Sequence, residues 1–180
     1  MAAERLFQPL RLGHLDLKHR MIMAPLTRFR ANDDHVPGPY SAEYYAQRAS
    51  VPGTLIITEA TFISPRAGGY NNVPGIWSEE QVKVWRQITD AVHSKGSYIY
   101  CQLWALGRVA VAKNLEREGG YPVVSASNIA VDSDHEEPKA LTEEEIHGFT
   151  QDYSNAARNA IKAGFDGVEA HGKLSTNFST

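Results

Sequence analysis

The stretch GFDGVEAHG, residues 164–172, decides how this chain folds. It is a short, largely apolar run that follows a segment with helical periodicity, and it ends on a histidine, His171. A buried strand that follows a helix and carries polar side chains at its end is typical of α/β proteins, in which the C-terminal strand ends hold the active site. The sequence therefore predicts a strand here, with His171 at a functional edge of a sheet.

Three earlier apolar runs share these features and predict three further strands. They are MIMAPL (21–26), TLIITEATF (54–62) and SYIYCQLW (97–104). The first is continuous rather than alternating, which suits a strand of a parallel sheet covered on both faces. A small β-hairpin is expected before them, because residues 6–18 alternate apolar and polar on either side of Gly13-His14.

Helices are predicted between these strands. We expect Ser41 to cap a helix through Ala49, and we expect capping boxes where Ser78 precedes Gln81 and Thr142 precedes Glu145. Two apolar stripes predict the buried helix faces: Val82, Trp85, Ile88 and Val92 in one helix, and Ile146, Phe149, Tyr153, Ala156, Ala160 and Ile161 in the next.

Strands that alternate with helices imply right-handed crossovers and a parallel sheet. The loops after the strands are long and the returns from helix to strand are short, so function is expected at the C-terminal strand ends. A doubly wound sheet and a (β/α)8 barrel both fit this pattern. No strand is followed by a G-x-G-x-x-G turn, which favours the barrel, although four strands cannot close one.

Composition excludes several classes of protein. The chain has 180 residues, enough for one domain. Its net charge of −3 does not favour binding to nucleic acid or to an anionic membrane. With one cysteine, Cys101, it can form no internal disulfide, and we expect that thiol to be buried and inert. The sequence shows no signal-peptide pattern and no apolar run of about 20 residues. We therefore expect a cytoplasmic protein.

Polar side chains at the strand ends are the candidate site. Thr27, Gln102 and His171 offer a hydroxyl, an amide and an imidazole, a set that can read the edge of a planar heterocycle. The set lacks the carboxylate cluster that a metal prefers, and the chain has no G-x-S-x-G motif of a serine hydrolase. Structural roles stay open for all three, for Trp104 as a core residue, and for Glu59 and Glu169 as partners of basic groups. The run DSDHEEP (132–138) is interpreted as a solvated loop.

Several motifs together resemble the Old Yellow Enzyme family of flavin-dependent ene-reductases, and fungal members most of all. The resemblance is in register over residues 6–172. It rests on APLTR (24–28), LIITEATFIS (55–64), GGYNNVPGIWSEEQ (68–81), QLWALGR (102–108) and DGVEAHG (166–172).

The resemblance implies the N-terminal half of a TIM barrel with FMN across its C-terminal mouth. It also implies a ping-pong reaction, in which NAD(P)H reduces the flavin and the flavin then passes hydride to the activated alkene of an enal or enone. Small-molecule substrates are thus the implied partners. By position, the implied contacts of the flavin are Pro25, Thr27, Ala60, Gln102 and His171. Trp104 would shape the substrate pocket with His171, which would bind the substrate carbonyl and stabilise its developing negative charge.

The chain departs from the family pattern after Gly172. Leu174 stands at the second carbonyl-binding position, and Thr176 stands at the position of the tyrosine proton donor, where an aliphatic alcohol is a poor general acid. We expect residues 173–180 to be a divergent tail, and the chain 1–180 to be a partial barrel domain without strands five to eight. Three outcomes follow. The chain is an active enzyme completed by a second copy, a separate chain or a longer isoform; or a non-catalytic fragment that binds no flavin; or, less favoured, an enzyme with an altered activity such as isomerisation. Exposed strand edges would promote homo-oligomers.

Overall fold

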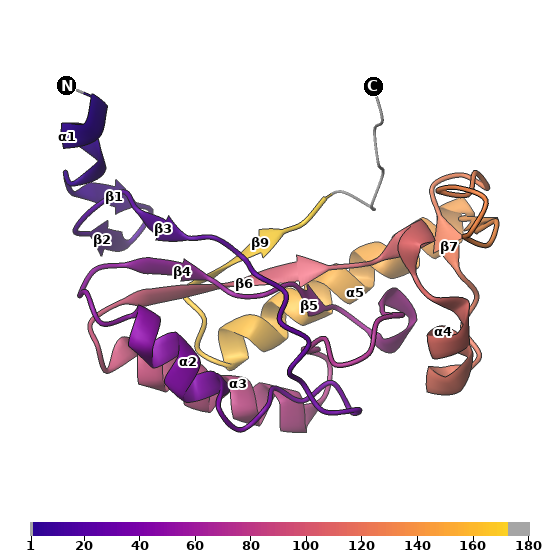
Figure 1. The fold of residues 1–180 in the computed structure, drawn as a ribbon, viewed down its shortest axis with the longest axis horizontal. Coiled ribbons are helices and arrows are strands. Elements are labelled where there is room, and N and C mark those ends of the chain that lie inside the picture. The colour runs from indigo at the N-terminus through magenta and orange to yellow at the C-terminus, as the bar shows by residue number, and fades with distance from the viewer. Residues whose placement is uncertain (1, 173–180) are drawn as a thin grey trace.

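The computed structural model describes residues 2–172, and their centre is a parallel sheet (Figure 1). Strand β6 lies in the middle, with β4 and then β3 on one side and β9 on the other. A short strand, β5, continues the path of β4 along β6. The bounds are Ile22–Met23 for β3, Leu55–Ile57 for β4, Thr61–Phe62 for β5, Tyr98–Trp104 for β6 and Gly167–Ala170 for β9.

Three helices connect these strands and pack on one face of the sheet (Figure 1). They are α2 (Ser41–Arg48), α3 (Glu79–His93) and α5 (Glu143–Lys162). Ile99, Cys101 and Leu103 of β6 point into the core between sheet and helices, where each is at most 2% exposed. The alternation of strands and helices confirms the predicted α/β class, with the strands and helices of half a barrel.

The helix starts were predicted with mixed success. Both capping boxes are present, Ser78 with Gln81 at α3 and Thr142 with Glu145 at α5. The prediction for Ser41 was wrong, because Ser41 is already the first residue of α2 and the capping position belongs to Tyr40, whose side chain makes no cap bond.

The spacing of apolar residues predicted the buried face of α3 better than that of α5. In α3 all four predicted side chains are buried. In α5 the prediction was wrong at both ends, because Ile146 is 49% and Ile161 is 58% exposed. Ile161 follows the fully buried Ala160 by one residue, about 100° around the helix, and so leaves the narrow face that meets the sheet.

The predicted hairpin is confirmed and closes one end of the sheet. Strands β1 (Leu10–Leu12) and β2 (Leu15–Leu17) pair antiparallel around Gly13, whose φ of 59° suits glycine. Leu15 and Leu17 pack on Leu55 at the N-terminal ends of the central strands. A helix not expected from the sequence, α1 (Ala2–Leu6), precedes the hairpin.

The loops beyond the C-terminal strand ends form a separate lobe (Figure 1). Its elements are η1 (Pro65–Ala67), η2 (Gly107–Val109), α4 (Ala112–Gly119), β7 (Val124–Ser125) and β8 (Lys139–Ala140). The acidic run 132–138 is exposed except at Pro138, which confirms a solvated loop. Within the described residues, no helix is both long and apolar enough to cross a membrane.

Candidate active site

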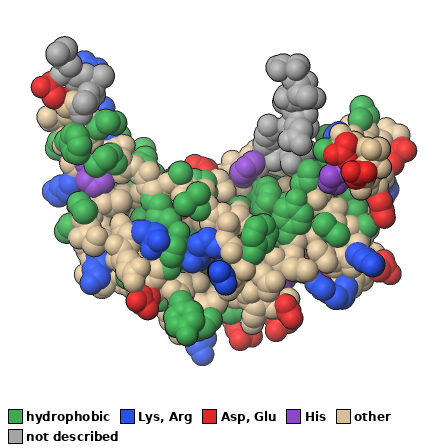
Figure 2. Space-filling model, viewed as in Figure 1, with side chains coloured by type: hydrophobic (Ala, Val, Ile, Leu, Met, Phe, Trp, Pro, Cys, Tyr) green, Lys and Arg blue, Asp and Glu red, His purple; other side chains and the backbone are tan. Residues whose placement is uncertain are grey.

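The side chains of interest lie where the strands end, on the sheet face opposite the helices. Successive side chains of a strand alternate between faces. Since Cys101 and Leu103 point towards the helices, Gln102 and Trp104 lie on the other face. The hairpin covers the far end of that face, and the surface above the sheet is hollowed and lined in part by hydrophobic side chains (Figure 2). We call the C-terminal edge of this face the mouth.

Gln102 is fixed at the mouth by two neighbouring strands. Its side-chain Nε2 donates to Glu169 Oε1 at 2.7 Å, and its backbone N–H donates to Thr58 Oγ1 at 3.0 Å. The side chain is buried, with 5% of the residue exposed, so the amide has the partner that burial requires. Within residues 2–172 the partner of Glu169 is this amide and not a basic group, contrary to the alternative that it pairs with a base.

Trp104 and His171 lie side by side at the mouth. Their ring centroids are 6.1 Å apart, and the backbone N–H of His171 donates to Leu103 O at 2.9 Å. Trp104 Nε1 and His171 Nδ1 are both buried without a hydrogen-bond partner among the described residues. A buried polar atom without a partner is costly, so these two nitrogens mark a place where a ligand can bind.

The other predicted residues lie on neighbouring strand ends. Pro25 and Thr27 follow β3, where Pro25 is half-buried and Thr27 is exposed. Ala60 lies between β4 and β5 and is 5% exposed. The predicted single strand 54–62 is therefore interrupted at this point. Leu174 and Thr176 lie outside the described residues.

A buried ion pair beneath the mouth confirms the structural alternative for Glu59. Arg28 holds Glu59 through its backbone N–H at 3.2 Å, its Nε at 3.0 Å and a further contact from Nη2. Tyr45 Oη donates to the same carboxylate at 3.4 Å, and accepts the Glu59 N–H at 3.0 Å. Burial alone would lower the pKa of Arg28, yet the hydrogen bond and charge of Glu59 raise it above its ordinary value. The role of Tyr45 could not be read from the sequence.

An apolar cavity of about 430 Å³ adjoins the mouth. It lies between α5 and the loop lobe, and His171 and Gly172 form part of its lining. The exposed Ile146 of α5 lines it as well, which explains why this residue is not covered by the sheet. Space for an apolar group is therefore available beside the unpartnered histidine.

Comparison with known proteins decides the family. The sequence pattern of the NADH:flavin oxidoreductase / NADH oxidase family matches residues 5–176. The chain belongs to this family. Within it, the crystal structure of Old Yellow Enzyme from Pichia sp. AKU4542 superimposes with a TM-score of 0.88 at 42% identity, over 94% of this chain and 46% of that one. The resemblance to Old Yellow Enzyme and the half-barrel fold are thus confirmed.

Fungal relatives in the family carry informative names. The NADP-dependent oxidoreductase lnbE of Aspergillus flavus is 61% identical over 93% of this chain and 44% of its own length. The chanoclavine-I aldehyde reductase fgaOx3 of Penicillium roqueforti is 59% identical over 93% of this chain and 45% of its own. A "probable inactive reductase", easA of Epichloe festucae var. lolii, is 51% identical over 96% and 45%. This chain spans less than half the length of these relatives.

The residues present at the mouth fit the flavin of this family. The mouth holds an amide, two unpartnered ring nitrogens and flat aromatic surfaces, which suit an extended heterocycle with hydrogen-bonding edges. Among the described residues no group of three or more His, Cys, Asp or Glu side chains is placed to hold a metal ion.

Proposed function

We propose that this chain forms the flavin-facing half of an FMN-dependent oxidoreductase of the Old Yellow Enzyme type. The proposed reaction passes hydride from NAD(P)H, via FMN, to the activated C=C bond of an α,β-unsaturated aldehyde or ketone. The observation that carries it is the pair of buried, unpartnered nitrogens on Trp104 and His171 beside the oriented amide of Gln102.

Each residue at the mouth has a role in this proposal. When bound, FMN accepts hydride from NAD(P)H and delivers it to the alkene. Pro25 and Thr27 would contact one edge of the flavin from β3, and the backbone N–H of Ala60 and the amide of Gln102 would hold its polar atoms.

His171 has the central role towards the substrate. An N–H of its ring would donate to the substrate carbonyl oxygen and stabilise the negative charge that grows there as hydride arrives at the β-carbon. Its backbone bond to Leu103 O extends the pairing of β9 with β6 and so fixes the backbone of His171 at the strand end. Trp104 would form the adjoining wall of the substrate pocket.

The names of the relatives support a substrate class and a reductant. Three of them are named as aldehyde reductases, two from Penicillium roqueforti and one from Cladobotryum sp., and one is named NADP-dependent. We therefore propose an unsaturated aldehyde as substrate and NADPH as reductant.

A second candidate function is a non-catalytic protein that binds no flavin. Leu174 and Thr176 replace the groups that the family pattern offers for carbonyl binding and proton donation. One relative is named as a probable inactive reductase, which supports this candidate. In that case the mouth would be a remnant of the catalytic site.

Flavin uptake separates the two candidates. The chain is expressed, mixed with FMN, desalted, and scanned for flavin absorbance against protein content. Near-stoichiometric flavin is expected for the wild type, with clear loss in Gln102→Leu. The matched control is Gln47→Leu, because Gln47 is an exposed amide on α2. Folded but colourless wild-type protein would overturn the first candidate and support the second.

A further inference from the structure

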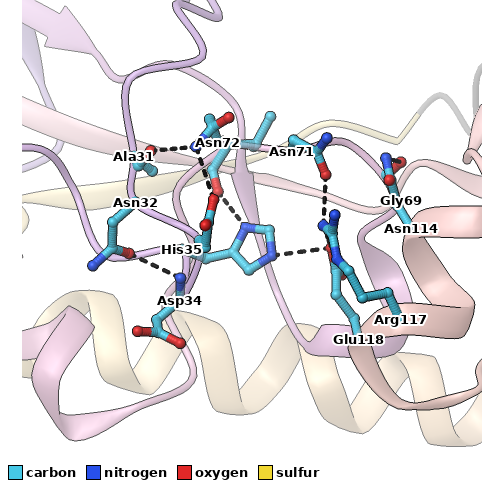
Figure 3. A network of polar contacts seen from close by, with 12 residues as sticks. Ala31, Asn32, Asp34, His35, Gly69, Asn71, Asn72, Asn114, Arg117 and Glu118 are labelled. Atoms are coloured by element: carbon cyan, nitrogen blue, oxygen red, sulfur yellow. Dashed lines mark hydrogen bonds and ion pairs between the residues drawn. The ribbon is translucent and has the colours of Figure 1, made fainter.

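A buried histidine joins the loop after β3 to helix α4 of the loop lobe (Figure 3). His35 is 5% exposed, and its Nδ1 lies 2.5 Å from Val73 O. Its Nε2 lies 3.5 Å from Glu118 Oε1 of α4. No hydrogen bond among the described residues reaches either carboxylate oxygen of Glu118. We call His35 and Glu118 the clasp.

The contacts of His35 fix where its hydrogens are. A backbone carbonyl only accepts, so Nδ1 carries a hydrogen and donates it to Val73 O. A neutral imidazole would then turn the lone pair of Nε2 towards an ionised carboxylate, and the two would repel. The clasp is attractive only when a further proton lies between Nε2 and Glu118.

Four aromatic rings connect the clasp to the mouth. The ring of His35 meets Phe62 edge-on at 5.7 Å, and Phe62 stacks on Trp104 at 5.6 Å. Trp104 in turn lies 6.1 Å from His171. Phe62 is fully buried, and close-packed rings cannot move singly, so a displacement of His35 shifts the ring behind Trp104.

We propose that His35 and Glu118 are positioning residues for Trp104, acting through Phe62. The clasp holds the loop after β3 against α4 and thereby sets the angle of the indole wall beside His171. The role of the clasp in orienting a substrate rests on the proposed function. The contact between His35 and Glu118 and its effect on Trp104 do not depend on that function. Because the clasp needs one proton, it loosens as pH rises and that proton leaves.

Other charged groups lie close to the clasp. Arg117 Nη2 lies 3.6 Å from Glu118 Oε1 but is held by Asn71 Oδ1 at 2.7 Å (Figure 3). Arg117 is therefore the second cation that faces Glu118, and it persists at every physiological pH. Besides Glu118, the acidic residues that line the open cavity next to His35 are Asp33 and Asp34 from its own loop and Glu80 from α3.

The test uses the indole N–H signals of the three tryptophans in NMR spectra of the whole chain, without flavin. Trp104→Phe assigns the signal of Trp104. In Glu118→Ala this signal should move. Glu118→Gln should restore the wild-type position, because its amide can donate to Nε2 without an added proton. Glu116→Ala is the control, since Glu116 is an exposed neighbour on α4.

Comparison of spectra at about pH 5.5 and about pH 8.5, on either side of ordinary histidine titration, adds a second criterion. Glu118→Gln serves as the reference, because it keeps every group near Trp104 except the carboxylate of the clasp. The wild type should show a larger movement of the Trp104 signal than Glu118→Gln does.

Two results would overturn the proposal. One is a Trp104 signal that is the same in wild type and in folded Glu118→Ala. The other is an equal pH response in wild type and Glu118→Gln, which decides the matter even when Glu118→Ala does not fold. Because no flavin is present, this outcome is independent of flavin uptake, and each proposal can fail alone.

Discussion

Replacing Arg28 by alanine should be among the most destabilising changes in this chain. The substitution removes the guanidinium from Glu59 but leaves the backbone N–H of residue 28 and Tyr45 as partners of the carboxylate. The side chain of Glu59 is 4% exposed and that of Arg28 is 18% exposed. Water can therefore compensate only in part for the lost guanidinium.

The burial of the Arg28–Glu59 pair sets the expected loss of unfolding free energy in Arg28→Ala. Removing one partner of a buried ion pair costs about 3–5 kcal/mol, because the remaining charge is left without compensation. The two retained contacts of Glu59 place the expected loss near the lower figure. With a urea dependence of about 2 kcal/mol per molar, a loss of about 3 kcal/mol lowers the unfolding midpoint by about 1.5 M.

Urea unfolding of dilute protein, followed by tryptophan fluorescence, measures this loss. Trp85 is a suitable reporter because its ring lies 6.3 Å from that of Tyr45. Arg48→Ala is the matched control. Both guanidinium groups lie over the ring of Tyr44, at 3.8 Å for Arg28 and 3.5 Å for Arg48. Arg48 is exposed, however, and no carboxylate in the described part of the chain pairs with it. Its loss should be below about 1 kcal/mol. Equal losses in the two variants would refute the assignment of the energy to the buried pair.

Three further predictions concern other parts of the chain. Burial raises the pKa of the Cys101 thiol to about 12, so at pH 8 a thiol reagent should label it only as fast as the protein unfolds; rapid labelling of folded protein would contradict its burial. Thr142→Ala removes the cap of α5 and should cost about 1 kcal/mol in urea unfolding, whereas Thr150→Ala, at an exposed site within that helix, should cost less. We also predict self-association of the chain in sedimentation, since Ile22 on the outer strand β3 is 43% exposed; a single monomeric species at all concentrations would argue against it.

Features set by neighbouring residues could be predicted from the sequence. Ser78 and Gln81 are three residues apart, so the pattern alone indicated how α3 begins. The hairpin around Gly13 is local in the same sense. The prediction for Ser41 failed because the cap is decided by the backbone path of the preceding loop, which composition does not reveal.

Features that depend on distant contacts were not predictable in this way. Arg28 and Glu59 are 31 residues apart, and their pairing depends on the adjacent positions of β3 and β4 in the sheet. His35 and Glu118 meet only because the loop after β3 and helix α4 come together at the strand ends. At the mouth, the strand pattern indicated which side chains lie together, but not that two ring nitrogens would be left without partners.

The leucines of the hairpin also affect how ligands can reach the site. Leu15 and Leu17 pack against Leu55 and cover the N-terminal end of the sheet face, so ligands are expected to reach this face from the mouth. Under the proposed function, reductant and alkene would both bind at the mouth and compete for it, so an excess of either should slow turnover.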